Sequence, residues 1–195
     1  KTGYEDLTTD DVTLQITPKT ATITVDNAEK FFDEEDPAFT GTVTDLVNES
    51  DLGTVSYKRT NAEEAVGIYK EVLTAEFTDN SNYNVIVQKG DFQIKTAAIT
   101  GAALTAAGGS WVYDGNAHRA EAIVENADGY TIYYKTEGGT WSTEVPSVTN
   151  VSDGKVTVSV MAVKTGYEDL NTEDVTLEIT PRDATIVVDD AEKFF

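Results

Sequence analysis

Residues 155–163 read KVTVSVMAV, and small polar and apolar side chains alternate along most of this stretch. Successive side chains of an extended strand point to opposite faces, so a period of two is typical of a half-buried β-strand. One face would carry Val156, Val158, Val160 and Ala162, and the other Thr157, Ser159, Met161 and Val163. The stretch therefore predicts a strand whose first face lies in a hydrophobic core.

This strand runs directly into a segment that occurs twice in the chain. Residues 1–32 read KTGYEDLTTDDVTLQITPKTATITVDNAEKFF, and residues 164–195 read KTGYEDLNTEDVTLEITPRDATIVVDDAEKFF. The two copies are offset by 163 positions and are identical at 25 of 32 positions. The sequence therefore predicts a parent protein with a repeating unit of 163 residues, of which this chain spans one period and the start of the next.

Proline marks boundaries inside the repeating unit. Ile16-Thr17-Pro18 recurs as Ile179-Thr180-Pro181, and an alternating segment follows each copy. Proline has no backbone N–H and ends strand pairing, and the period is too long for a solenoid repeat. We therefore expect two small β domains, at residues 18–96 and 97–181. Residues 1–17 would be the terminal strand of a preceding repeat, and residues 182–195 the first strand of the next.

The rest of the pattern predicts an almost purely β chain. In the first domain we expect strands at residues 21–25, 39–46, 54–58, 67–77, 83–88 and 92–95, a hairpin turn at Lys89-Gly90-Asp91, and at most a turn of helix at 61–66. In the second domain we expect strands at residues 98–104, 111–113, 118–124, 131–135, 148–151, 155–163 and 175–179, with glycine at the turns. This spacing indicates two tandem β-sandwiches, which we expect in an extended arrangement.

Composition narrows the possible partners. The chain has 35 acidic and 14 basic residues and a net charge of −21, so it repels nucleic acid and anionic membranes. It contains no cysteine, which excludes disulfides and thiol chemistry. No apolar run approaches the roughly 20 residues that span a bilayer, so we expect no membrane insertion of these residues. The simplest interpretation of the negative charge is that it keeps the chain soluble.

The densest acidic cluster is Asp33-Glu34-Glu35-Asp36. Calcium prefers carboxylate oxygens, so Asp33, Glu35 and Asp36 are the candidate metal ligands. The alternative is a solvated loop stiffened by Pro37, because the spacing of an EF-hand loop is absent. Further carboxylates that could add ligands at a domain junction are Asp26, Asp189 and Asp190. No other cofactor is expected.

Aromatic side chains gather in the second domain. Exposed aromatic faces bind sugars and partner proteins, so Trp111, Trp141 and Tyr134 are candidate contacts for a host glycan or protein. The alternative for each is packing in the core or across a hairpin. Tyr133 and Tyr134 are adjacent on one strand, so we expect at most one of them in the core.

The chain is not expected to be an enzyme. His118 is the only histidine, and without cysteine neither a zinc site nor a catalytic triad has its partners. Acidic residues are so abundant that no carboxylate pair stands out for glycoside hydrolysis. An intramolecular isopeptide bond is also not expected, because no lysine has a clearly inward strand position.

Five segments of the first domain together resemble the MBG repeats of bacterial surface adhesins: ATITV (21–25), FDEEDPAFT (32–40), GTVSYKR (53–59), VGIY (66–69) and NYNV (82–85). The family usually has Tyr-Gly where this chain has Phe31-Phe32. Residues 97–181 look like a bacterial Ig-like repeat, on VYDG (112–115), IYY (132–134) and GYEDL (166–170). The resemblance implies Ig-like and MBG-like sandwiches.

The same resemblance implies a cell-surface protein of a Gram-positive bacterium, anchored to the cell wall. Its repeats would act as a stalk or spacer with neighbouring repeats of the same chain as partners. The alternative is an adhesin module that binds a mucin-like glycan or a host protein. Tyr4 and Tyr167 are expected to tie a crossover by their hydroxyls, like a tyrosine corner. At least one terminal segment is expected to pair with a neighbouring chain or with this chain's own sheets, because lone edge strands leave backbone groups unpaired.

Overall fold

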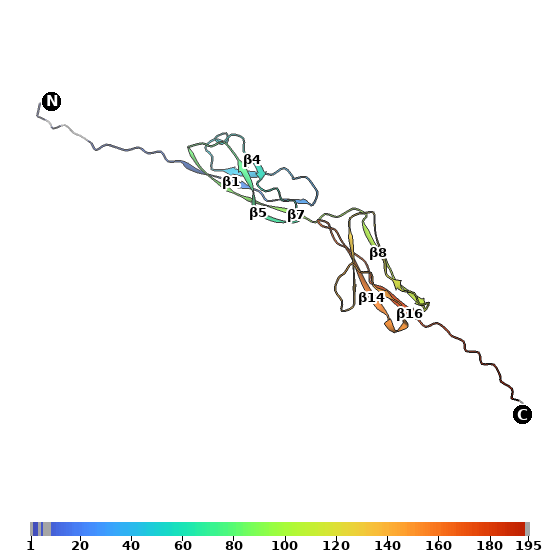
Figure 1. Ribbon diagram of the computed structural model, residues 1–195. Helices are drawn as coiled ribbons and strands as arrows, with labels where there is room; N and C mark the ends of the chain where they lie inside the picture. The colour runs from blue at the N-terminus through green and yellow to red at the C-terminus, as the bar shows by residue number, and fades with distance from the viewer. Residues whose placement is uncertain (1, 4, 6–8, 194–195) are drawn as a thin grey trace. The chain divides into compact units, whose positions relative to one another are not determined.

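The computed structural model describes residues 2–3, 5 and 9–193. The chain divides into two units, Lys1–Lys95 and Thr96–Phe195, a boundary one residue before the predicted seam. Both units are built of β-strands (Figure 1), and the described residues contain no α-helix. The all-β, sandwich-like fold class is therefore confirmed, while the extended arrangement of the domains stays a prediction. Within the described residues no helix is long and apolar enough to cross a membrane.

Unit 1 consists of two sheets, with strand orders β3-β1-β6 and β2-β7-β5-β4. The strands are β1 (Lys19–Val25), β2 (Ala28–Phe31), β3 (Gly41–Thr44), β4 (Ser56–Arg59), β5 (Gly67–Glu76), β6 (Tyr83–Gln88) and β7 (Gly90–Lys95). Most were predicted within a few residues, but β2 was not. Residues 61–66, where we predict at most a turn of helix, contain none.

Two consecutive strand pairs run parallel through both sheets. β1 pairs with β6, and β2 pairs with β7. The register is constant: each residue lies opposite the one 64 positions later, as Lys19 lies opposite Tyr83 and Phe31 opposite Lys95. The crossing from β1 to β2 and the crossing from β6 to β7 therefore lie side by side.

The crossing between β6 and β7 overturns the hairpin predicted at Lys89-Gly90-Asp91. β6 and β7 belong to different sheets and do not pair with each other. At the crossing the backbone N–H of Asp91 donates to Oδ1 of Asn27, 2.7 Å away. A Cβ on Gly90 would lie 2.4 Å from the carbonyl oxygen of Asp26, so the close approach of the two crossings requires glycine.

The core of unit 1 is organised around β1. Its alternating residues Ala21, Ile23 and Val25 are buried, as the period of two predicts. They pack in two adjoining clusters with the buried residues Leu52, Leu73, Tyr83, Phe92 and Ile94. All of these residues belong to unit 1.

Unit 2 has one large sheet, β12-β14-β16-β9 with β15 beside β14, and two small pairs, β11-β8 and β10-β13. The strands are β8 (Ala103–Ala107), β9 (Gly109–Val112), β10 (His118–Arg119), β11 (Glu121–Glu125), β12 (Thr131–Thr136), β13 (Ser147–Val148), β14 (Val156–Val163), β15 (Leu170–Asn171) and β16 (Val175–Thr180). A 3-10 turn, η1 (Val151–Asp153), stands where the predicted strand 148–151 ends.

The core of unit 2 confirms the face predicted for β14. Val158, Val160 and Ala162 are buried and pack against Leu177 and Ile179 of β16. The strand predicted at residues 98–104 is wrong over its first five residues. A turn closed by the N–H of Ala102 on the carbonyl of Ile99, with Gly101 at positive φ, occupies this stretch instead.

Where the structure describes the terminal segments, at residues 9–18 and 181–193, they form no strand in this chain's own sheets. All of these residues are exposed. The repeat explains why. Leu14 is 91% exposed, whereas its equivalent Leu177 in β16 is fully buried. The place that residues 12–17 would fill in a sheet of this chain is already filled by β16.

Candidate binding surface

Trp141 is the sequence-predicted aromatic that the structure leaves open to solvent. It is 40% exposed, and Nζ of Lys135 lies 4.9 Å from the centre of its ring. The chain reaches it through a turn at Gly138 after β12, then returns alongside that strand. Tyr134 and Ser142 exchange two backbone hydrogen bonds of 2.7 and 2.9 Å, which hold the segment carrying Trp141 against β12.

A shallow groove of about 540 Å³ begins at the same turn. Its walls offer hydroxyl, carboxylate and ammonium groups from β12, β14 and the loop before β16. The lining residues are Lys135, Thr136, Glu137, Gly138, Gly139, Thr157, Ser159 and Asp174. Such polar groups beside an aromatic face are a chemistry suited to the hydroxyl groups of a sugar or to a polar protein surface.

Trp111 is packed rather than presented. Its ring lies against the core of unit 2 and stacks on His118, with ring centres 4.6 Å apart and planes 17° apart. Nε2 of His118 lies 3.1 Å from Oδ1 of Asp114. Hydrogen bonds lower the pKa of Asp114 to about 2. The largest effect comes from the backbone N–H of Asn116, followed by the side-chain amide of Asn116 and then by His118. Trp111 therefore matches the alternative given in the sequence analysis, in which the ring packs in the core.

Tyr134 is not available to a ligand, which corrects its place among the candidate contacts. It is 7% exposed and belongs to the core of unit 2, while its neighbour Tyr133 is half-buried. The alternation of β12 requires these two rings to point to opposite faces, and Tyr134 takes the inward one.

The acidic cluster after β2 is arranged for ion pairs within the chain. Oδ1 of Asp36 lies 3.0 Å from Nζ of Lys30, and Oδ2 lies 3.1 Å from Nε of Arg59. Glu64 pairs with the same two cations. Lys30 is inward, contrary to the expectation that no lysine would be: only 4% of its side chain is exposed.

The pKa shifts of this network favour its charged forms. The hydrogen bond to Glu64 raises the pKa of Lys30 against the opposing effect of burial, and the hydrogen bond from Lys30 lowers the pKa of Glu64. An isopeptide bond needs a neutral amine as nucleophile, so the network holds Lys30 in the unreactive form.

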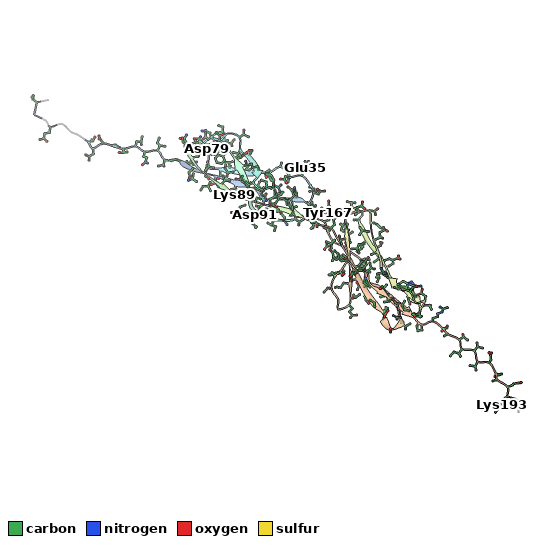
Figure 2. The ribbon with its side chains drawn as sticks, in the orientation of Figure 1. Glu35, Asp79, Lys89, Asp91, Tyr167 and Lys193 are labelled. Carbon is green, nitrogen blue, oxygen red and sulfur yellow. The ribbon has the colours of Figure 1, made fainter. Side chains whose placement is uncertain are left out.

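No metal site emerges from the predicted ligands. Within the part of the chain that the structure describes, no three His, Asp or Glu side chains are grouped to hold a metal ion. Asp36 is engaged by two cations, and Glu35 is exposed on the loop after β2 (Figure 2). Asp26 accepts a hydrogen bond of 2.7 Å from Oγ1 of Thr40. Asp189 and Asp190 lie in the exposed segment after β16.

Tyr167 sits at a turn that fastens the start of unit 2. Ala97 bridges to Tyr167, with its N–H donating to Gly166 and its carbonyl accepting from Glu168. Nζ of Lys164 lies 4.4 Å from the centre of the Tyr167 ring. The ring and its turn thus contribute to the structure of unit 2. Tyr4, the equivalent residue in the first copy of the repeated segment, lies outside the described residues.

Comparison with known proteins finds a family similarity in the first unit. Residues 21–93 match the family model of the MBG domain (YGX type). Among solved structures, the fibronectin(III)-like modules of Clostridium thermocellum CbhA are similar at 12% identity, with 82% of this chain and 94% of that chain covered and a TM-score of 0.31. No curated protein matches. Residues 21–93 of unit 1 are thus similar to an MBG domain, and a second β unit follows them.

Proposed function

We propose that this chain is a structural repeat of a bacterial surface protein and serves as a stalk or spacer outside the cell. The observation that carries the proposal is the 163-residue period, which encloses one MBG domain and one further β unit, each with its own core. The proposal places the protein on the cell wall of a Gram-positive bacterium and gives it no catalytic role.

Two features of the units suit a spacer. Each core is closed by strands of its own unit, so a repeat can be added without rebuilding its neighbours. The net charge of −21 keeps long arrays soluble and discourages one stalk from adhering to the next. Addition of repeats would then lengthen the molecule without adding new chemistry.

The length of arrays tests the proposal. Proteins with one, two and three 163-residue repeats are compared by small-angle X-ray scattering. We expect the maximum dimension to rise by the same increment for each added repeat. Arrays that collapse, with a radius of gyration close to that of a compact domain of equal mass, would contradict a spacer.

A second function is favoured by Trp141. Its exposed ring and the neighbouring polar groove support an adhesive module for a host glycan or protein. A glycan array and a mucin pull-down with the chain test this, with Trp141→Ala as the variant and Phe31→Ala as an exposed aromatic control. Binding that only Trp141→Ala abolishes supports adhesion, and a blank array and pull-down argue for a pure spacer.

A further inference from the structure

The step from the last strand of unit 2 to the unit 1 that follows is very short. The repeat aligns Thr180 with Thr17, Pro181 with Pro18 and Arg182 with Lys19. β16 ends at Thr180, and β1 begins at Lys19. In consecutive repeats, which the proposed function assumes, a single proline therefore separates the two strands.

Hydrogen bonds fasten one loop to each side of this step. In unit 2 the N–H of Tyr113 donates to the carbonyl of Thr180, 2.9 Å away. In unit 1 the N–H of Lys19 donates to the carbonyl of Asn82, 2.8 Å away. Two residues of extended chain span at most about 7 Å. The loop that carries Tyr113 and the loop that carries Asn82 must therefore meet at the junction between repeats.

Each of the two sides exposes apolar side chains. Val112 and Tyr113 are 58% and 42% exposed at the end of unit 2, and Val47 is 71% exposed at the start of unit 1. Beside Val47 lies an open recess of about 450 Å³. Its lining beyond the linker residues 16–19 is Val47, Asn48, Asp51, Ser81, Asn82 and Tyr83.

The recess has a firm polar wall. The hydroxyl of Tyr83 donates to Oδ2 of Asp51 at 2.6 Å and accepts from the N–H of Val47 at 2.7 Å. Proline fixes its own φ and keeps the preceding residue extended, so the linker adds little freedom.

We infer that Tyr113 of one repeat docks into this recess on the unit 1 of the next repeat, and that Val112 and Val47 are covered by the same contact. This interface is noncovalent and acts together with the covalent one-proline linker. It makes the junction between repeats a fixed joint.

A longer chain tests the inference. Residues 33–95 are appended after Phe195, the equivalent of Phe32, so that a second copy of unit 1 follows unit 2. Tyr113→Cys is combined with Val47→Cys in the second copy. The sequence has no cysteine of its own, so one disulfide reports one contact. We expect it to form in a glutathione buffer at a rate independent of protein concentration.

Two matched pairs control for tethering. Val47→Cys in the first copy has no unit 2 before it, and Asn84→Cys in the second copy lies on the opposite face of β6 from Tyr83 at a similar distance from the linker. We expect the docked pair to form its disulfide at least about tenfold faster than either control.

Equal rates for Val47 and Asn84 in the second copy, with both copies folded by circular dichroism, would overturn the docking. That result would leave the spacer proposal intact, because a flexible joint still adds length. Conversely, arrays that fail the scattering test would leave a fast, specific disulfide standing.

Discussion

Nζ of Lys30 and Oδ1 of Asp36 lie 3.0 Å apart at the edge of unit 1, where the lysine side chain is almost completely covered. Arg59 joins the pair through Asp36, and its guanidinium lies 4.9 Å from the centre of the buried Phe92 ring. The network thus connects an acidic surface loop to the core. A charge removed from the covered side of such a network leaves its partners without compensation.

Lys30→Met should destabilise unit 1 by about 1–3 kcal/mol, because Asp36 and Glu64 would share only Arg59. Lys58→Met is the control, since Lys58 pairs with Glu76 and both side chains are more than half exposed. We expect that variant to change stability by less than about 1 kcal/mol. Urea unfolding followed by far-UV circular dichroism measures both, and equal effects would mean that the covered pair has no special role.

Acid should weaken unit 2 through Asp114. Its pKa is about 2 in the folded chain against 3.8 for a free side chain. A depressed carboxyl pKa stabilises the fold above the unfolded value, and this contribution is lost as the pH falls from about 3.8 to about 2. Asp114→Asn should flatten that part of the pH profile. Tryptophan fluorescence reads unit 2 alone, because both tryptophans lie there, and an unchanged slope for the variant would contradict the assignment.

The two copies of the repeated segment give a substitution with its own internal control. Leu177→Ala should cost about 2–5 kcal/mol, because Leu177 is fully buried in unit 2. Leu14→Ala, the same change in the other copy, should stay within about 0.5 kcal/mol. Thermal unfolding measures both. A large effect of Leu14→Ala would show that residues 12–17 are packed in solution.

Gly90→Ala should destabilise unit 1 by about 1–3 kcal/mol, because its Cβ would meet the backbone of Asp26 at the sheet crossing. Gly67→Ala is the matched change in the same unit, where the nearest atoms lie 3.9 Å from the added Cβ. Guanidinium unfolding should place Gly67→Ala near the parent. If Gly90→Ala lowers stability as little as Gly67→Ala does, the two adjacent chain crossings can move apart to make room for the added methyl group.

Trp111→Ala should cost about 2–4 kcal/mol, because the ring packs against the core and stacks on His118. Trp141→Ala should cost less than about 1 kcal/mol, since Trp141 is 40% exposed and lies outside the core cluster of unit 2. Urea titrations of each variant, read by circular dichroism, separate the structural tryptophan from the exposed one. A larger loss of stability for Trp141→Ala than for Trp111→Ala would contradict this assignment.

Hydrophobic periodicity predicted those parts of the fold that depend only on the local sequence pattern. The faces of β1 and β14 follow from alternation alone, since Ile23 and Val160 stand at inward positions of a period of two. Local signals failed where the partner is remote. Gly90 lies in a sequence typical of a hairpin, but the two strands that it joins pair with different sheets.

The candidate sites show the same limit. The order of Tyr133 and Tyr134 shows that they face opposite ways. Only the register of β12 on β14, which sets Tyr134 opposite the buried Val160, decides which one is buried. Lys30 gave no sign of its burial, because its partners Asp36, Arg59 and Glu64 come together only in the folded unit. Trp141 could be predicted as a candidate, and its exposure could not.

The constant register between β1–β2 and β6–β7 determines how unit 1 bears a load. Lys19, where the chain enters, lies beside the start of β6, and Lys95, where it leaves, lies beside the end of β2. Traction on these two ends slides the paired strands along each other, so the backbone hydrogen bonds of both pairs must shear together instead of opening one by one. A tether made of such modules would resist flow by sharing tension across a whole row of bonds.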